Sequence, residues 1–428
     1  MSSSAAVSAT PGAFSAGSAY RPRYVDIGIN LADPIYRGRY YGKQRHPDDL
    51  AGVIQRAREV GCTRLLVTGS SFKSSRDALR LAEQFPSTVY TTAGVHPCSS
   101  AIFERNHTRH HEEDEDVDAD ANTDAAEHTP ACGPDPTKPH AEDNEVDPTK
   151  SAQIVADLRA LIETAVPSTA LVAFGEIGLD YDRLHYCAAS TQRHAFAAQL
   201  ALAADLAAAG RPLPLFLHSR ACHDDFVRLL QAQFGPRLET LARGGVVHSF
   251  TGTIAEAEAL MDLGLYLGVN GCSLKTAENC DVVRAIRLDR LMLETDGPWC
   301  EVRPSHAGWQ YLVEATAAAK QAEAAVAATQ ETATTTNPET TSNGKPPAPS
   351  RQKKQSNNSS KKKEPQVPER FKVVKKEKWE EGAMVKGRNE PCTIERVATI
   401  VAAIKGVPVE TVCEAAWANS VKMFGLDG

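Results

Sequence analysis

Side chains that ligate metal ions or transfer protons stand at the ends of seven apolar segments of this sequence. These side chains are Asp26, His96, Glu176, His218, His248, Asn270 and Asp296. Imidazole nitrogens and carboxylate oxygens together form a ligand set that suits Zn²⁺, Mn²⁺ or Mg²⁺. A carboxylate such as Glu176 can also bridge two cations that lie roughly 3.5 to 4 Å apart, an arrangement suited to phosphoryl transfer. The sequence therefore predicts a metal centre if these distant residues meet.

Each of these residues has a simpler explanation when it is taken alone. Glu176 after its strand, and His218 and His248 after theirs, are typical of hydrogen-bonded turn or core residues. Asp296, within ETDGP, is equally consistent with a turn. Several buried polar side chains without a ligand would however be costly. Their joint placement at strand ends is what favours a functional site.

The elements that would position these residues are eight short apolar segments separated by helix-like segments. The apolar segments are YVDIGIN (24–30), RLLVTGS (64–70), VYTTAGVH (89–96), LVAFGE (171–176), LPLFLHS (213–219), GVVHSF (245–250), LYLGVNG (265–271) and LMLETDG (291–297). Strands that alternate with helices predict a parallel sheet, and eight of them predict an α/β fold of the (β/α)8 TIM-barrel type. All strand ends would then meet at one mouth. An open doubly wound sheet is the alternative.

The domain organisation follows from shifts in composition. Residues 1–20 are rich in Ser, Ala and Gly and are predicted to be a disordered lead-in, and residues 21–428 are predicted to form a single barrel domain. Two disordered segments would interrupt it, an acidic insert at 103–150 and a low-complexity basic linker at 315–369 that begins as an Ala/Glu-rich helix. Two amphipathic helices within 392–424 would close the fold.

The charge of the chain lies mainly in these two segments. Glu104 to Lys150 contains fifteen acidic and four basic residues, and Lys345 to Lys378 contains twelve basic and three acidic residues. The acidic insert is best explained as a solvated loop, although its histidines could bind metal loosely. The lysines of the linker are consistent with nuclear localisation, with nucleic-acid binding or with a plain linker.

Other features of composition bear on location. The ten cysteines form no C-x-x-C pair, and no charged segment followed by an apolar segment opens the chain. These features predict an intracellular protein of the nucleus or cytoplasm with reduced thiols. No apolar run approaches the eighteen or so residues of a membrane span, so we expect no membrane association. The oligomeric state is not predictable from these data.

Eight stretches of the sequence resemble the TatD-type metal-dependent deoxyribonucleases, and particularly the eukaryotic branch of that family. They are DIGINLADPIYRG (26–38), AGVHP (93–97), GEIGLDYDR (175–183), FLHSR (216–220), HSFTGT (248–253), NGCSLKT (270–276), LETDGPWC (293–300) and KWEEGAMVKGRNEPC (378–392). The resemblance implies a barrel of the metal-dependent hydrolase superfamily that cleaves DNA phosphodiester bonds. It also implies 3′ to 5′ exonuclease activity and a role in DNA repair or degradation.

By matching motif, Glu176, His218, His248 and Asp296 stand at metal-ligand positions, and His96 lies beside the site. Many family members carry an H-x-H pair on the first strand, where this chain has Gly28 and Asn30. We therefore expect two divalent ions, of which the first is held weakly by Glu176 and Asp296. An oxygen-rich site of that kind suits Mg²⁺. The second ion would be held more tightly by Glu176, His218 and His248.

The remaining roles concern catalysis and the grip on substrate. Glu176 or Asp296 is expected to deprotonate the attacking water, and His96 to protonate the leaving 3′ oxygen or to bind a phosphate oxygen. Four residues just beyond strand ends are expected to contact DNA, namely Arg220, Lys275 and Ser249 at phosphates and Trp299 at a base. The near-neutral body of the chain favours strand ends or single strands over long duplex.

Two other functions remain open at this level. Another metal hydrolase on the same barrel would act on an amide, an ester or a lactone, and only the motif resemblance favours phosphodiesters. A non-catalytic DNA-binding relative would have lost metal binding together with the H-x-H pair. The presence of Glu176, His218, His248 and Asp296 argues against that loss.

Overall fold

A computed structural model of the chain describes residues 20–107, 138–165, 169–334 and 367–426. The predicted lead-in, except Tyr20, and the central parts of both predicted inserts lie outside the described residues. Tyr20 itself is fixed, because its hydroxyl donates a hydrogen bond of 2.9 Å to Glu414. Among the described residues, no helix combines the length and the apolar character needed to cross a membrane.

Eight parallel strands form one sheet whose order follows the chain, β1-β4-β5-β6-β7-β8-β9-β10. They are β1 Tyr24–Ile29, β4 Cys62–Val67, β5 Val89–Ala93, β6 Leu171–Asp180, β7 Leu215–Arg220, β8 Gly245–Val247, β9 Tyr266–Val269 and β10 Leu291–Leu293. The two edges meet just beyond the ends of β1 and β10, where the amide of Asp296 donates to Gly28 and that of Asn30 donates to Gly297, each at 2.8 Å. The predicted barrel is thus confirmed, and the open sheet was the wrong alternative.

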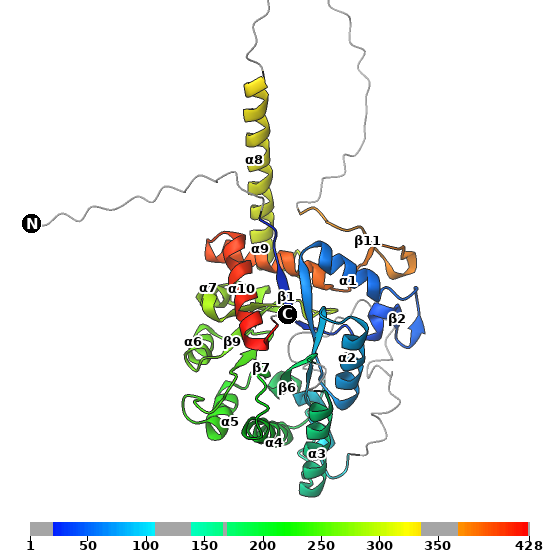
Figure 1. Cartoon of the computed structure of the whole chain (residues 1–428), viewed down its shortest axis with the longest axis vertical. Coiled ribbons are helices and arrows are strands. Elements are labelled where there is room, and N and C mark those ends of the chain that lie inside the picture. The colour runs from blue at the N-terminus through cyan, green and yellow to red at the C-terminus, as the bar shows by residue number, and fades with distance from the viewer. Residues whose placement is uncertain (1–19, 108–137, 166–168, 335–366, 427–428) are drawn as a thin grey trace, which may run out of the picture.

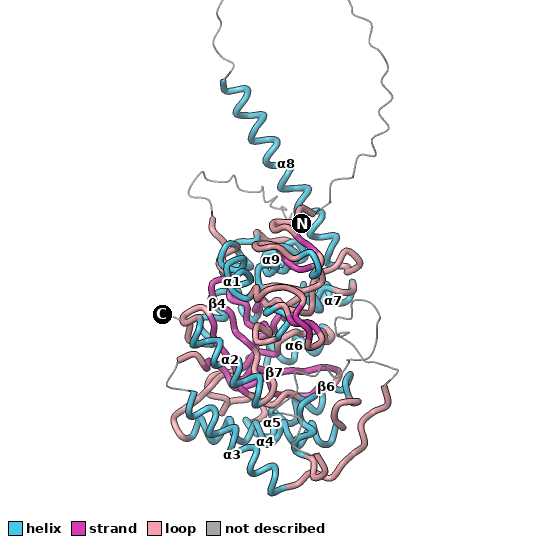
Figure 2. The backbone as a smooth tube through the Cα atoms, turned by 90° about the vertical axis from the view of Figure 1, so that its right-hand side faces the viewer, coloured by secondary structure: helices cyan, strands magenta, loops and turns pink. Residues whose placement is uncertain are grey.

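Helices cover the outside of this sheet (Figure 1). They are α1 Leu50–Glu59, α2 Phe72–Gln84, α3 Pro148–Ala165, α4 Ala189–Ala208, α5 His223–Phe234, α6 Ile254–Asp262, α7 Ala277–Ala285, α8 Gly308–Thr334, α9 Ile394–Lys405 and α10 Val409–Phe424. Their apolar faces pack on the strands and on one another, as where Phe196 of α4 stacks on Phe226 of α5. Figure 2 shows that the far part of α8 projects away from the barrel.

One end of the barrel interior is filled by the C-terminal part of the chain. Inward-facing residues such as Ile27, Phe216 and Met292 form a buried cluster with Met423 and Phe424 at the end of α10. This cluster closes the end at which the strands begin. The opposite end, where the strands finish, remains available for polar side chains.

The acidic insert is shorter than its predicted bounds of 103–150. Phe103 is fully buried at the end of a 3-10 helix, Pro97–Phe103. Glu104 pairs with Val146 as an isolated bridge, and α3 already begins at Pro148. Apolar residues at both edges of the segment therefore attach it to the barrel. The basic linker begins as the predicted helix, because α8 extends to Thr334.

A strap formed by residues 367–393 leads into α9 and contains the short strands β11 Val373–Val374 and β12 Met384–Val385. It is anchored to α1 by a buried ionic cluster of Arg56, Asp49, Arg388 and Glu390. Arg56 lies 2.7 Å from Glu390 and 2.8 Å from Asp49. The strap thereby becomes part of the barrel wall.

Candidate active site

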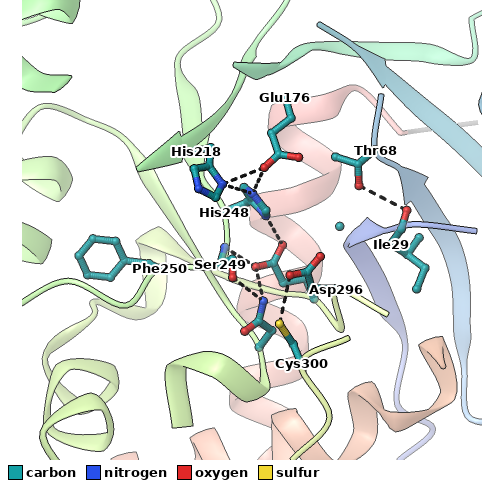
Figure 3. A network of polar contacts seen from close by, with 12 residues as sticks. Ile29, Thr68, Glu176, His218, His248, Ser249, Phe250, Asp296 and Cys300 are labelled. Carbon is teal, nitrogen blue, oxygen red and sulfur yellow. Dashed lines mark hydrogen bonds and ion pairs between the residues drawn. The ribbon is translucent and has the colours of Figure 1, made fainter. Parts of the chain in front are cut away.

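Polar side chains converge on one oxygen of Glu176 at the end of the barrel where the strands finish (Figure 3). His218 Nδ1 lies 2.9 Å from Glu176 Oε1, His248 Nε2 lies 2.5 Å from it, and His96 Nε2 lies 3.3 Å from it. Glu176 belongs to β6 and His218 to β7, whereas His248 follows β8 and His96 follows β5. Residues far apart in the chain thus meet because neighbouring parallel strands end together.

Strand β6 holds the ring of His218 at both nitrogens. It continues four residues past Glu176 to Asp180, whose Oδ2 lies 3.1 Å from His218 Nε2. With Nε2 engaged by Asp180, Nδ1 faces Glu176. Burial favours the neutral acid, but the hydrogen bond and charge of His218 outweigh it and lower the pKa of Asp180.

His248 has a comparable partner in Glu294, which lies directly after β10. His248 Nδ1 is 3.5 Å from Glu294 Oε2, and neither atom has a hydrogen-bond partner among the described residues. Glu294 is completely buried, and its other oxygen accepts from the amides of Ser249 and of the Asn270 side chain. A Cβ at Gly28 would lie only 2.5 Å from Glu294 Oε2. The glutamate therefore uses the room in front of a strand position that has no side chain.

Asp296 completes the polar mouth from the loop after β10. Its Oδ1 accepts from Asn30 Nδ2 and its Oδ2 lies close to Cys300 Sγ, both at 3.2 Å. Burial, together with the nearby carboxylates of Glu294 and Glu176, raises the pKa of Asp296 to about 6 against the opposing charge of His248. Asp296 is therefore suited to accept a proton.

The donor set fits a divalent cation. Ligand atoms of His96, Glu176 and His218 all lie within 4.8 Å of one another. Burial tends to raise the pKa of Glu176, but the charges of His248 and His96 lower it well below its usual value. His248 Nδ1 and Glu294 Oε2 are the unpaired polar atoms just described. Buried imidazoles and acids in such numbers are satisfied when a cation takes the position that their facing atoms share.

The other predicted residues surround this centre at different depths. Ser249 is buried, and its hydroxyl accepts from Asn270 at 2.9 Å. Arg220 is half-buried and donates to the Ser249 carbonyl at 3.2 Å, while its Nε has no hydrogen-bond partner within the described part of the chain. Trp299 is half-buried, and its carbonyl accepts from Asn389 of the strap at 2.8 Å.

Lys275 lies beside an open hollow of about 500 Å³ that His306 and Trp309 also line. Burial lowers the pKa of Lys275, and the neighbouring Arg220 and Arg303 contribute to this shift. Burial also lowers the pKa of His306 to about 4, helped by Lys275 and Arg303. Positive side chains therefore gather on this side of the mouth.

One strand-end residue from the sequence does not face the mouth. Asp26 is fully buried, and it accepts from the amide of Thr295 at 2.9 Å and from its hydroxyl at 2.5 Å. Its carboxylate joins β1 to the segment after β10. Asp26 thus has a structural role in closing the barrel.

Sequence reasoning missed Asp180 and Glu294. Asp180 lies in the motif GLDYD, four residues after Glu176, and Glu294 lies in the motif LETD, two residues before Asp296. Because strand side chains alternate between two faces, Glu294 and Asp296 at positions i and i+2 are expected on the same side. The same alternation relates Glu176 to Asp180 at i+4. That spacing is the signal from which both residues were predictable.

Comparisons with known proteins add to this geometry. Residues 25–344 match the family described as TatD related DNase. The chain is 38% identical over 94% of its length to Deoxyribonuclease Tat-D of Schizosaccharomyces pombe, 96% of which is covered. It is 35% identical over 66% of its length to the 3′-5′ ssDNA/RNA exonuclease TatD of a Pantoea species, 82% of which is covered. A TatD family hydrolase structure from Entamoeba histolytica, 23% identical, shares the fold with a TM-score of 0.64, covering 96% of this chain and 100% of that one.

Proposed function

The chain belongs to the family of TatD related DNases and is a hydrolase, and on this premise we propose that it cleaves phosphodiester bonds of DNA with divalent metal ions. The observation that carries the proposal is the approach of three imidazole nitrogens to one carboxylate oxygen of Glu176 at the barrel mouth. This arrangement supports metal binding.

Two cations would be held by different parts of this set. Glu176, His218 and His248 would hold the tighter ion, and Glu176 with Asp296 the weaker one, for which Mg²⁺ or Mn²⁺ is suited and Zn²⁺ is an alternative. Bound ions supply an acidified water and stabilise charge on the leaving oxygen. Asp180 and Glu294 keep the rings of His218 and His248 oriented toward this centre.

Proton transfer is assigned to Asp296 and His96. Asp296, whose pKa is raised to about 6, receives the proton of the attacking water at its carboxylate. His96 Nδ1 accepts from the amide of Cys98 at 3.1 Å, so the proton of the ring stands on Nε2, the nitrogen that faces the site. Burial lowers the pKa of His96, but the charge of Glu176 outweighs this effect and raises it. As the imidazolium, which the raised pKa favours, His96 would give its Nε2 proton to the leaving 3′ oxygen and keep a proton on Nδ1. The neutral ring, whose only proton stands on Nε2, would instead donate a hydrogen bond to a phosphate oxygen.

Arg220 and Lys275 are the groups that would hold phosphates. Neither side chain forms an ion pair with a carboxylate within the part of the chain that the structure describes. Cations without a carboxylate partner beside the mouth remain available to the phosphates of a strand. Ser249 contributes less because its hydroxyl is buried, and Trp299 at the rim is the candidate for base stacking.

The finer activity is proposed from the name of one relative and from the motif resemblance. The Pantoea relative is named as a 3′-5′ exonuclease of single-stranded DNA and RNA. We extend the 3′ to 5′ direction and the preference for single strands or ends to this chain, and a role in DNA repair or degradation with them. Because few basic side chains lie at the mouth, the site is expected to bind a few phosphates and not a long duplex.

Substitution of Glu176 tests the proposal. Glu176→Gln keeps the shape of the side chain but removes its charge, so we expect cleavage of labelled single-stranded DNA in Mg²⁺ or Mn²⁺ to fall by about 10³-fold. Elemental analysis of the purified variant should show less bound metal. Glu258→Gln on the exposed face of α6 is the control and should retain full activity.

Two results would contradict the assignment. Near wild-type cleavage by Glu176→Gln would remove the metal centre from the mechanism. Hydrolysis of small amides, esters or lactones by the wild-type chain, with no cleavage of DNA of any form, would instead identify another hydrolase on this barrel.

A further inference from the structure

We infer that an exposed lobe outside the metal centre binds the single-stranded DNA that flanks the reacting phosphate. The lobe consists of residues 37–46, which follow β1, and residues 371–382 of the strap, and we call it the hairpin–strap lobe. The inference rests on the proposed function and specifies which form of DNA the enzyme holds. It also concerns the end of the basic segment for which the sequence left several roles open.

Two segments far apart in the chain build the lobe, and Figure 1 shows β2 and β11 on the same side of the barrel. Residues 37–46 form a hairpin of β2 Arg39–Tyr40 and β3 Lys43–Gln44. The ring of His46 stacks on Trp379 of the strap, with centroids 5.4 Å apart and planes at 11°. The contacts fix the hairpin against the strap.

The tip of the hairpin presents an aromatic ring to solvent. Tyr41 and Gly42 both have positive φ, 51° and 67°, as a two-residue hairpin turn requires. Tyr41 is 55% exposed as a result, although it is a large apolar residue. Lys376 of the strap lies 5.1 Å from the ring of Tyr40 and 5.9 Å from that of Tyr41. An exposed aromatic ring thus lies beside a basic side chain on the surface of the lobe.

The charge of the lobe is largely uncompensated. Its two segments contain eight basic and three acidic residues. Arg37 pairs with Asp48, and Lys372 pairs with Glu380. Among the ion pairs of the described residues, none includes the other strap lysines and two hairpin cations, namely Lys43, Arg45, Lys375, Lys376 and Lys378. Repulsion among these cations is relieved when a polyanion binds.

The lobe is joined to the catalytic loop through Tyr36. This residue lies just before the hairpin, and its hydroxyl donates to the carbonyl of Asn389 at 2.7 Å. A Cβ at Gly297, next to Asp296, would lie 2.6 Å from the same hydroxyl. Tyr36 therefore holds the start of the hairpin against the Asp296 loop. A single strand of DNA that leaves the mouth on this side would meet the lobe.

The chemistry of the lobe favours unpaired nucleotides. Exposed aromatic rings stack on bases, whose faces are accessible in single strands and are covered in duplex DNA. Lysines and an arginine around the rings would contact the phosphates without reading sequence. Trp379 and Tyr40 are engaged within the lobe, so Tyr41 is the ring available for stacking.

Binding of a fluorescein-labelled single strand of 20 nucleotides to the full chain in EDTA tests the lobe independently of catalysis. In the double variant Lys43→Gln/Lys375→Gln, we expect the dissociation constant at low salt to rise about 5- to 10-fold. The plot of the logarithm of the association constant against the logarithm of salt concentration should become less steep by about 1.4. Each phosphate contact on a single strand contributes about 0.7 to that slope, and two lysines are removed. The matched double variant Arg237→Gln/Lys422→Gln, altered at exposed positions of α10 and of the loop before β8, should behave as wild type.

Tyr41→Ala separates stacking from charge. We expect it to weaken binding of the single strand several-fold with an unchanged salt slope. In cleavage assays with Mn²⁺, both lobe variants should raise KM for the long strand without changing kcat, and should leave a trinucleotide unaffected. Thermal unfolding of the variants is measured in parallel, so that a folding defect is recognised.

Three outcomes would overturn the inference. One is an unchanged affinity and salt slope in the double variant. Another is an equal loss on the trinucleotide and on the long strand, which would indicate damage to the site itself. The third is tighter binding of blunt duplex than of single strand by the wild type, lost in the lobe variants. If the chain binds single strands through the lobe but cleaves no DNA, the proposed function fails and the lobe stands.

Discussion

The ring of His218 is held between two carboxylates of one strand, Glu176 and Asp180. A ring engaged at Nε2 presents only Nδ1 to the centre, in one tautomer and one orientation. Such an arrangement lowers the entropic cost of binding a metal ion. His248 is backed by Glu294 in a looser contact of 3.5 Å. The two histidines are therefore expected to differ in how firmly they are oriented.

Replacement of Asp180 tests this positioning. In Asp180→Asn, the amide can present its nitrogen to the ring and no longer fixes the proton on Nε2. We expect the dissociation constant for Mn²⁺ at the tighter site to rise about 10- to 100-fold, with little change in overall stability. Calorimetric titration of metal-free protein measures it. Asp182→Asn, two residues along the chain and half-exposed, is the control. An unchanged affinity for Mn²⁺ in Asp180→Asn would show that Asp180 does not contribute to metal binding.

At the scale of elements, the strap is what fixes the loop after β10. Asn389 donates to the carbonyl of Thr295 at 3.0 Å and to that of Trp299 at 2.8 Å, on either side of Asp296. Its neighbours Arg388 and Glu390 belong to the buried ionic cluster with Arg56 and Asp49. The position of a catalytic side chain thus depends on a salt-bridge cluster in another part of the barrel wall.

Removal of Arg388 should be costly, because it leaves Asp49 and Glu390 buried with only Arg56 between them. The Arg388 side chain is 1% exposed, and Arg388→Met is expected to lower the free energy of unfolding by about 3 to 5 kcal/mol. Urea denaturation measures this change. Arg370→Met breaks an exposed pair with Glu395 and should cost no more than about 1 kcal/mol. Equal losses of unfolding free energy in the two variants would show that the buried cluster stabilises the protein no more than an exposed ion pair does.

At the scale of the whole molecule, the barrel gathers several acidic side chains near one end, among them Asp26, Glu176, Glu294 and Asp296. Glu294 raises the pKa of both Asp26 and Asp296, although burial is the larger cause for each. Mutual repulsion of these groups opposes folding. A bound cation is expected to relieve that repulsion across strands from both halves of the chain.

Metal should therefore stabilise the protein as well as activate it. Addition of Mn²⁺ at 100 times its dissociation constant to EDTA-treated protein should add about 2.7 kcal/mol to the free energy of unfolding. Differential scanning calorimetry should show a higher Tm, and Glu176→Gln should show a smaller rise. The same Tm with and without Mn²⁺ would exclude a site that binds only the folded chain.

Most of the fold was predictable because its signals are local. Each of the eight strands overlaps with a predicted apolar run, although β6 continues past its run to Asp180. The bounds of the acidic insert were too wide because its edges dock through single residues such as Phe103. The family resemblance is confirmed by matches over most of the chain.

The site was predictable in outline only. The topology of a parallel barrel brings Glu176, His218, His248 and Asp296 to one end, and the family motifs identify these residues in the sequence. Spacing along the chain places Asp180 and Glu294 on the same side as Glu176 and Asp296, but only the structure shows that they pair with His218 and His248. The contact between β1 and the segment after β10 places Glu294 in the space next to Gly28. The same contact brings Asn30 within hydrogen-bond distance of Asp296.

The last part of the chain touches both ends of the barrel. Phe424 and Leu426 fill the floor, and Asn389 holds the loop at the mouth. A nascent polypeptide on the ribosome carries every proposed metal ligand long before these residues emerge from the exit tunnel. A polypeptide cut short before Asn389 is therefore expected to carry those ligands without the contacts that fix the Asp296 loop and fill the floor of the barrel.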